Sequence, residues 1–265
     1  SFTYPNDQPS TTLWYHDHTL GMTRNNVYAG PAGFWLIRDN GGETGLVTGT
    51  LPGPAPVAGE DLLETNVTGR DKYREIPIVI QDRSFNADGS LFYPGDRAFF
   101  EGVPVSDLSI PFIGDPKDPS DIAPIWNPEA FFNVMVVNGV SWPNLDVEPD
   151  LYRLRLLNGC NSRVINLSLQ ALDAGGNPLG EVPFYQIGAE QSLMPNVVQV
   201  STGFKTALPG DGTIPAPTPA VAPEEALLMG LAERADVLVD FGNLPAGTVT
   251  VRMVNTAPDA PFGGF

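Results

Sequence analysis

The sequence predicts an all-β protein whose short strands form a sandwich or a barrel. Glycine and proline are the first reason, with 28 and 27 copies among 265 residues, because this density interrupts the chain too often for long helices. The second reason is that no stretch of ten residues repeats its apolar positions with the 3.6-residue period of an amphipathic helix. The third is a series of short alternating runs separated by turn signals, a pattern typical of sandwiches and barrels.

The first expected strand covers residues 12–18 and contains both histidines of the chain. Side chains on a strand alternate between its two faces. His16 and His18 would therefore project to the same side of the strand, and Asp17 would project to the opposite side. This spacing places two imidazoles close enough to bind one metal ion together, or to bind two neighbouring metal ions separately.

Several shorter signals shape the connections. We expect a loop over residues 21–26, and residues 30–33 (GPAG) permit a close backbone approach before a strand at residues 34–38. Asn138-Gly139 is a strong hairpin-turn signal between two extended runs. Pro223-Glu224-Glu225 is expected to form a single helical turn.

A second unit begins near Arg74 and contains most of the expected strands. The run at residues 76–82 is apolar and suits a buried strand. In two later runs, apolar residues alternate with polar ones, so that each presents one apolar face. The further strands are expected at residues 132–137, 152–156, 165–169, 184–189, 196–200, 234–241 and 248–253.

Charge and composition exclude several classes of function. The net charge is −17, which repels phosphate backbones and anionic lipid, so we expect no nucleic-acid partner and no binding to a membrane surface. The chain has one cysteine, Cys160, and so no internal disulfide. No run of 18 apolar residues is present, so the sequence predicts no transmembrane helix.

The histidine pair suggests a metal site but does not complete one. Imidazole binds copper, zinc or iron well. A closed zinc site needs four ligands and a catalytic one needs three and a water molecule. The missing ligands would have to come from carboxylates, from Cys160 or from polypeptide outside this chain. Taken alone, a single His-x-His is also a common accident of sequence.

The residues around the pair make the signal more specific. Residues 11–39, with Trp14-Tyr15-His16-Asp17-His18 and a later YAG…G before an apolar strand, resemble the second copper motif of the multicopper oxidases. The similarity is to the branch of bacterial laccases, spore-coat oxidases, bilirubin oxidases and phenoxazinone synthases. The segments IPIVIQDR, VMVVNGVSWPNLDVEP, YRLRLLNGCNSRVINLSL and LAERADVLVDF resemble the middle domain of the same family.

The resemblance implies a cupredoxin-like Greek-key β-sandwich or barrel, with one complete domain and the C-terminal strands of a preceding one. Residues 1–40 would be the end of the first cupredoxin domain, and residues 41–73 a linker. Residues 74–257 would be the copper-free second domain, and residues 258–265 would begin the linker to a third. The first and last residues read like the interior of a longer chain, so we expect a fragment.

The resemblance also implies a function. Family members oxidise phenols, aromatic amines or similar reductants at a type 1 copper and reduce dioxygen to water at a trinuclear cluster. His16 and His18 match the motif in which each histidine binds a different type 3 copper, so this chain would supply only part of the ligands. Its partners would be the rest of the first domain and the third domain, in the same polypeptide or as separate chains. An extracytoplasmic location, secreted, periplasmic or on a spore surface, is also implied.

Other residues receive smaller roles. Asp17 would tune the histidines by accepting a hydrogen bond or, more in keeping with its opposite face, form a structural hydrogen bond. Arg24 would pair with Asp17 or with nothing. Phe131 and Ser162 are candidates for one wall of the substrate pocket.

Cys160 is not expected to bind type 1 copper, because no histidine follows residue 18. It is expected to be a small loop or core residue. Asp82-Arg83 is expected to be an ion pair or a turn anchor.

Two other functions remain open from the sequence. One is a mononuclear His-x-His metal site on a β scaffold, completed by a carboxylate, with hydrolytic or lyase-like activity. The other is a non-catalytic cupredoxin module that serves as a scaffold.

Overall fold

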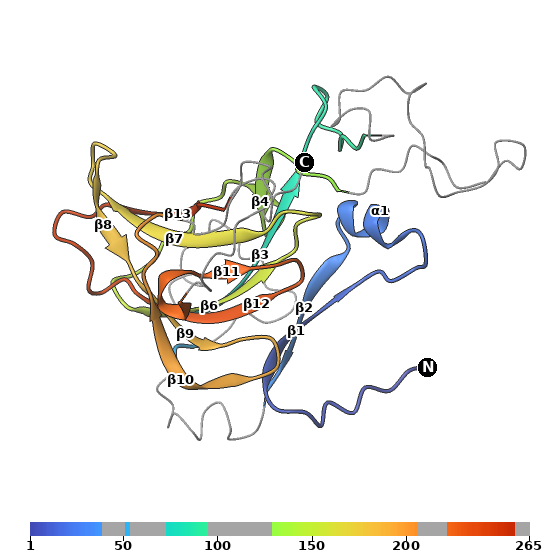
Figure 1. Cartoon of the computed structure of the whole chain (residues 1–265), viewed down its shortest axis with the longest axis horizontal. Helices are drawn as coiled ribbons and strands as arrows, with labels where there is room; N and C mark the ends of the chain where they lie inside the picture. Colours follow the sequence, from blue (N-terminus) through green and yellow to red (C-terminus); the bar gives the residue numbers. More distant parts are fainter. Residues whose placement is uncertain (39–50, 54–72, 95–128, 206–221, 258–265) are drawn as a thin grey trace, which may run out of the picture.

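The computed structural model describes residues 1–38, 51–53, 73–94, 129–205 and 222–257. Strands dominate these ranges, as Figure 1 shows. Their bounds are β1 Thr11–His16, β2 Ala32–Ile37, β3 Glu75–Arg83, β4 Val134–Val137, β5 Val140–Ser141, β6 Leu151–Asn158, β7 Ile165–Leu172, β8 Pro178–Val182, β9 Phe184–Gly188, β10 Leu193–Val200, β11 Leu228–Met229, β12 Arg234–Asp240 and β13 Thr250–Asn255. Within these ranges, the helical elements are α1, Thr23–Tyr28, and one turn of 3-10 helix, η3, Pro223–Glu225, where a helical turn was expected.

Two sheets form the larger part of the molecule. One has seven strands in the order β10-β9-β12-β6-β3-β4-β5, and β3 and β6 run parallel within it. The other is formed by β11, β7 and β13, with β8 also pairing with β7. Their inner faces enclose one apolar core, so the unit is a β-sandwich.

The core follows from the alternation of side chains along the strands. On β6, Tyr152, Leu154 and Leu156 point into the sandwich, and Ile165 and Leu167 of β7 meet them from the opposite sheet. Alternate residues of a strand share a face, so the intervening residues of β6 lie on the outer face of the seven-stranded sheet. That outer face is also buried, with Arg153 and Arg155 only 2% and 1% exposed.

The hairpin of β4 and β5 confirms the expected turn. Asn138 and Gly139 both have positive φ, 48° and 83°, as a two-residue hairpin turn requires. The Asn138 side chain accepts a hydrogen bond from the Val79 amide and donates one to the Pro77 carbonyl oxygen, both at 2.9 Å. The turn is thereby fastened to the neighbouring strand β3.

A separate two-stranded hairpin, β1 and β2, lies beside the sandwich (Figure 1). The strands pair from Thr11 opposite Ile37 to His16 opposite Ala32. Gly33 permits the close approach that the sequence indicated: a Cβ there would lie 2.6 Å from the Tyr15 hydroxyl oxygen. The strand expected at residues 12–18 is observed at Thr11–His16, so it ends two residues earlier than expected.

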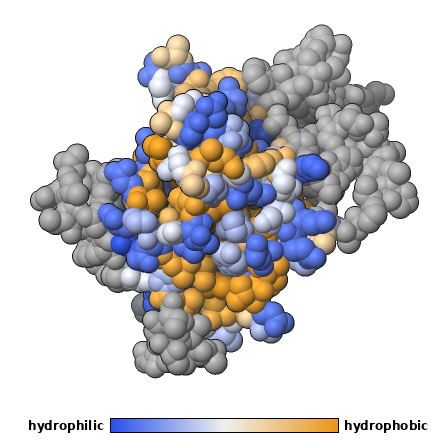
Figure 2. Space-filling model, turned by 90° about the vertical axis from the view of Figure 1, so that its left-hand side faces the viewer, coloured by the Kyte–Doolittle hydropathy of each residue, from blue (hydrophilic) through white to orange (hydrophobic). Residues whose placement is uncertain are grey.

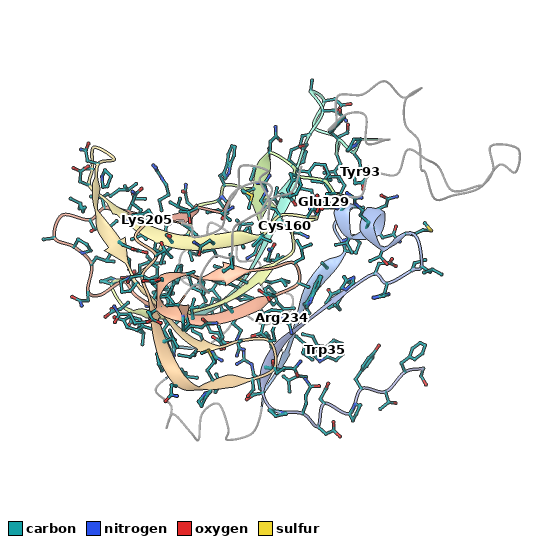
Figure 3. All side chains as sticks on the ribbon, viewed as in Figure 1. Trp35, Tyr93, Glu129, Cys160, Lys205 and Arg234 are labelled. Atoms are coloured by element: carbon teal, nitrogen blue, oxygen red, sulfur yellow. The ribbon has the colours of Figure 1, made fainter. Side chains whose placement is uncertain are left out.

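The loop expected over residues 21–26 is wrong in part, because α1 begins at Thr23. Six residues are too few for a stable isolated helix, so tertiary contacts must hold it. Tyr28, at its end, is buried with Phe132 and Tyr93, with ring centroids 4.5 and 5.2 Å away. Tyr93 lies beside this helix in Figure 3.

The predicted domain boundaries stay predictions. Most of the expected linker, residues 41–73, and all of residues 258–265 fall outside the described ranges.

Within the described ranges, no helix is both long and apolar enough to cross a membrane. On the side of the molecule that carries β8, polar and apolar surface alternate in the upper part, and a continuous apolar area lies at the lower centre (Figure 2). Leu179, Val197 and Val249 are among the large apolar side chains exposed to solvent.

Candidate metal centre

The two histidines lie side by side where β1 ends. His16 is the last residue of the strand, and His18 is two residues beyond it and exposed. Their ring centroids are 5.6 Å apart, with 35° between the ring planes. This spacing allows each ring to approach a metal ion from the same side of the chain.

The backbone orients the His16 ring. Its Nδ1 lies 2.6 Å from the carbonyl oxygen of Asp17. A carbonyl oxygen can only accept a hydrogen bond, so Nδ1 carries a hydrogen, and in the neutral ring Nε2 is then the nitrogen whose lone pair can bind a metal. Hydrogen bonds of this kind commonly orient a metal-binding histidine.

Trp14 also restrains His16. Residues 12, 14 and 16 share one face of β1. The indole of Trp14 stacks on the imidazole of His16, with ring centroids 4.4 Å apart and 26° between the planes. Tyr15 points to the opposite face and is 56% exposed.

Asp17 forms structural hydrogen bonds. Its carboxylate accepts from the amide and the hydroxyl of Thr19, at 3.0 and 2.8 Å, and from the side-chain amide of Asn26 at 3.0 Å. The Asn26 bond, followed by those of Thr19, lowers the pKa of Asp17 below its ordinary value. The carboxylate thus holds the connection between β1 and α1. Arg24, the other expected partner, donates instead to Asn161 Oδ1 at 3.1 Å.

The described residues supply no further ligand near the pair. They contain no group of three or more His, Cys, Asp or Glu side chains placed to bind a metal ion. Cys160 is buried in the sandwich core, as expected, and burial raises the pKa of its thiol far above the usual range. In this part of the chain, the donors that the sequence predicts for a metal ion are therefore limited to the imidazoles of His16 and His18.

Phe131 and Ser162 occupy a braced loop region. The Ser162 hydroxyl accepts from the Ala130 amide at 3.0 Å and donates to Asn161 Oδ1 at 3.1 Å. Phe131 is half-buried, with the Arg163 guanidinium 5.9 Å from its ring centroid. Neither residue is among those lining the cavity of about 420 Å³ between β3, β4 and the end of α1. Their proposed place in a substrate pocket stays a prediction.

Asp82 acts as an anchor, and its charged partner is not its neighbour Arg83. Its carboxylate accepts from the amides of Phe132 and Asn161, at 2.9 and 2.8 Å, and lies 3.7 Å from Nε of Arg163. Arg83 donates to the Val27 carbonyl oxygen at 3.2 Å, at the end of α1. Both residues therefore tie separate segments together.

A buried charge network was missed from the sequence. On the outer face of the seven-stranded sheet, Arg155 donates to Glu75 at 2.5 Å and lies 3.4 Å from Asp236, which also binds Arg153. Arg38, just after β2, forms two hydrogen bonds with Glu75, at 3.0 and 2.7 Å. The signal was available: charged residues interrupt three neighbouring strands at the positions that face away from the core.

No family model matches the chain. Among curated proteins it is 33% identical over 251 residues to a laccase of Bacillus stratosphericus, covering 95% of this chain and 36% of that protein. It is 34% identical over 242 residues to a laccase of Bacillus subtilis (strain 168), covering 90% and 32%. A laccase of Haloferax volcanii is 30% identical over 248 residues. The chain spans about a third of the length of these relatives.

Solved structures show the same fold. A multicopper oxidase from the hyperthermophile Aquifex aeolicus superposes with a TM-score of 0.60 and 24% identity, over 94% of this chain and 37% of that one. A laccase from Pediococcus acidilactici gives a TM-score of 0.56 and 25% identity, over 94% and 36%. The all-β, cupredoxin-like fold class expected from the sequence is thereby confirmed.

Proposed function

We propose that this chain, a relative of the laccases and other multicopper oxidases over nearly all of its length, supplies two copper ligands and the middle structural domain of a laccase-like oxidase. The observation that carries the proposal is the His16–His18 pair, with ring centroids 5.6 Å apart within the Trp14-Tyr15-His16-Asp17-His18 motif. The whole protein would oxidise phenols or aromatic amines and reduce dioxygen to water.

The donor chemistry fits copper. Imidazole is a good ligand for a copper ion that changes its oxidation state. The hydrogen bond from His16 Nδ1 to the Asp17 carbonyl oxygen leaves Nε2 of His16 available. His18 is exposed, so other polypeptide can approach its ring. His16 and His18 would each hold a separate type 3 copper ion, and these ions would supply the redox chemistry for the reduction of dioxygen.

The remaining ligands would come from polypeptide outside this chain. No histidine follows residue 18, so the chain cannot supply a second histidine motif. The trinuclear cluster and the type 1 copper would therefore need the rest of the first domain and a third domain, in the same polypeptide or as separate chains. An extracytoplasmic location follows from the same resemblance, and cell fractionation would test it.

The chain's own residues would hold the ligands rather than transfer protons. Trp14 stacks on the His16 ring and limits its rotation. Asp17 fastens the turn after the strand through Thr19 and Asn26. Both contacts fix ligand orientation before the metal binds, which reduces the ordering that binding requires.

The test is metal analysis of the natural polypeptide that contains this chain. We expect several copper ions per molecule, loss of bound copper in His16→Ala and His18→Ala, and loss of dioxygen consumption with a phenolic reductant. Tyr15→Phe is the matched control, because Tyr15 directly precedes His16, points to the opposite face of β1 and is exposed. A single tightly held zinc ion with no dependence on copper would instead support the mononuclear site, and absence of any bound metal would support the scaffold module.

A further inference from the structure

The hairpin that carries the histidines is anchored at the end farthest from them. Thr11 and Thr12, at the start of β1, are only 4% and 3% exposed. The Thr12 hydroxyl accepts a hydrogen bond from Nη1 of Arg155 at 2.9 Å, and the Thr12 carbonyl oxygen accepts one from Nε of Arg234 at 2.9 Å. Two arginines of the seven-stranded sheet therefore hold one residue of the hairpin.

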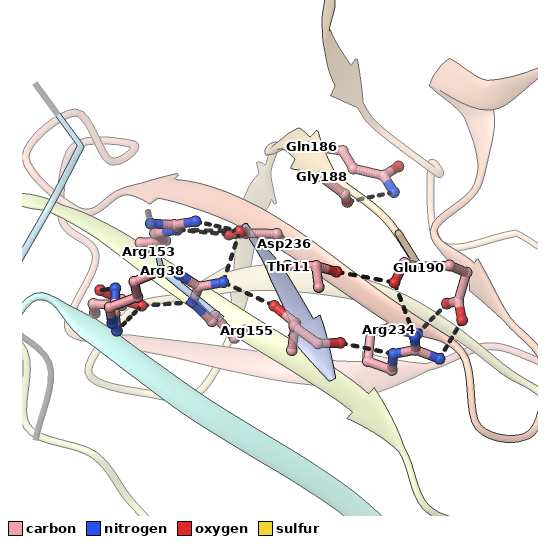
Figure 4. A network of polar contacts seen from close by, with 11 residues as sticks. Thr11, Arg38, Arg153, Arg155, Gln186, Gly188, Glu190, Arg234 and Asp236 are labelled. Atoms are coloured by element: carbon pink, nitrogen blue, oxygen red, sulfur yellow. Dashed lines mark hydrogen bonds and ion pairs between the residues drawn. The ribbon is translucent and has the colours of Figure 1, made fainter. Parts of the chain in front are cut away.

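These arginines are themselves fixed by a continuous network. From Arg38, contacts run through Glu75 to Arg155, and from Arg155 through Thr12 to Arg234 (Figure 4). Arg234 also forms an ion pair with Glu190, whose carbonyl oxygen accepts from the Thr11 hydroxyl at 3.0 Å. Glu75 and Asp236 surround Arg155 with two carboxylates.

Such a network tolerates little movement. A buried charge that loses its partner is strongly unfavourable, so each pair must keep its geometry. Apolar packing alone would allow the hairpin to slide by small amounts, because it has no preferred direction. Hydrogen bonds to both the side chain and the backbone of Thr12 are directional and specify one position of β1.

The anchored residue is on the same face as the ligand. Thr12, Trp14 and His16 alternate along β1, so all three project to one side. Trp14 stacks directly on His16. A displacement at Thr12 would therefore move the strand and the indole that restrains the His16 ring.

A second anchor fixes the far side of the histidine turn. Arg24 of α1 donates to Asn161 at 3.1 Å, and the Tyr28 hydroxyl donates to the Phe92 carbonyl oxygen at 2.6 Å. Between the two anchors, the segment with His16 and His18 is half-exposed or exposed. Its position is set from both ends by the β-sandwich unit.

We propose that Thr12, Arg155 and Arg234 are positioning residues for the copper ligands, so that the sandwich determines the placement of the histidine pair. This inference rests on the proposed function, because it assigns the network a role toward copper. It adds that two arginines of the sandwich, 143 and 222 positions from Thr12 in sequence, set the geometry of the His16 ligand.

The test uses the natural polypeptide that contains this chain, with Thr12→Val, Thr12→Ser, His16→Ala and the control Thr250→Val. Valine keeps the shape of threonine and removes the hydroxyl, whereas serine keeps the hydroxyl. Thr250 is an exposed residue of β13 in the other sheet. Copper affinity is measured by equilibrium dialysis, the coordination by the ultraviolet and visible absorption spectrum of the copper-loaded protein, and folding by the thermal midpoint of the metal-free protein.

We expect Thr12→Val to lower copper affinity by about threefold to tenfold. This decrease is no larger than the one that usually follows the removal of a group that orients a metal ligand. Its copper spectrum should change as well, while Thr12→Ser and Thr250→Val keep the wild-type values. If Thr12→Val does not fold, Arg234→Lys, which keeps the charge and loses the planar fork, is measured in the same way. Wild-type affinity and spectrum in a folded Thr12→Val or Arg234→Lys protein would overturn the inference. The proposed function fails separately, if His16→Ala retains all of its copper.

Discussion

The guanidinium of Arg155 donates a hydrogen bond to the hydroxyl of Thr12 at 2.9 Å, although 143 positions separate them in sequence. Arg155 lies on a central strand of the seven-stranded sheet, and Thr12 lies on the hairpin that ends in the histidine pair. The contact shows that the hairpin and the sandwich share one buried polar interface. The first prediction concerns the charge at the centre of this interface.

Glu75 should make stability dependent on pH in the acid range. Burial alone would raise its pKa, but hydrogen bonds from Arg38 and the charges of Arg155 and Arg153 lower the pKa below its ordinary value of 4.5. A carboxylate with a lowered pKa stabilises the folded state above its unfolded pKa and loses that contribution as the pH falls toward its folded pKa. We therefore expect the free energy of unfolding to decrease below about pH 4.5.

Glu75→Gln separates this effect from general acid denaturation. We expect the variant to lose about 3–5 kcal/mol at pH 7, the usual cost of removing one partner of a buried pair. Its stability should then depend less on pH below 4.5 than that of the wild type. Denaturant unfolding at a series of pH values measures both, with Glu224→Gln, an exposed residue of η3, as the control. Equal pH dependence in Glu75→Gln and the wild type would contradict the assignment.

The strand β6 shows what the sequence could and could not predict. Alternation of Tyr152, Leu154 and Leu156 with two arginines correctly predicted a strand with one apolar face. The same pattern gave no prediction of what the two arginines contact, and both are buried. Alternation reports how side chains are distributed between two faces, and it does not report what covers each face. Here the cover comes from a segment far away in the chain.

The histidine turn illustrates the same limit. The spacing of His16 and His18 predicted adjacent rings, and the rings are adjacent, but the strand ends at His16. The expected loop contains the start of α1, whose six residues give too weak a local signal for a helix. Buried contacts of Tyr28 hold it in place. Local pattern thus predicted which residues come together, while long-range packing determined the exact backbone.

Cys160 should be chemically inert in the folded protein. It is buried in the core, its thiol lies 3.7 Å from the Ile80 carbonyl oxygen, and its pKa is raised by burial. The thiolate is the reactive form, so a buried thiol with a raised pKa reacts slowly. We expect maleimide labelling of Cys160, followed by peptide mass, to be complete only in denaturant. Rapid labelling of the native protein at pH 7 would mean that the core around Cys160 opens easily.

Leu156 should be among the most sensitive core positions. Its side chain is fully buried between the two sheets. Leu156→Ala removes apolar contacts and leaves a cavity, so we expect a loss of about 2–5 kcal/mol in the free energy of unfolding. Leu179→Ala is the control, because Leu179 on β8 is 39% exposed and should change stability much less. Equal losses in the two variants would show that the sandwich core does not carry the stability of this part of the chain.

Asp17 should act on the backbone of the histidine turn and not as a proton donor. All three of its hydrogen bonds are to Thr19 and Asn26, and these bonds close the connection between β1 and α1. Asp17→Ala removes them, so we expect faster proteolysis near Gly21 and weaker copper binding in the natural polypeptide. Asp17→Asn should be intermediate, because its single carbonyl oxygen can accept only part of the same set. The pH profile of dioxygen reduction should keep its shape in both variants, since Asp17 holds the turn and does not transfer a proton to the reacting groups. Loss of one limb of that profile, with unchanged proteolysis, would instead assign Asp17 a direct role in proton transfer.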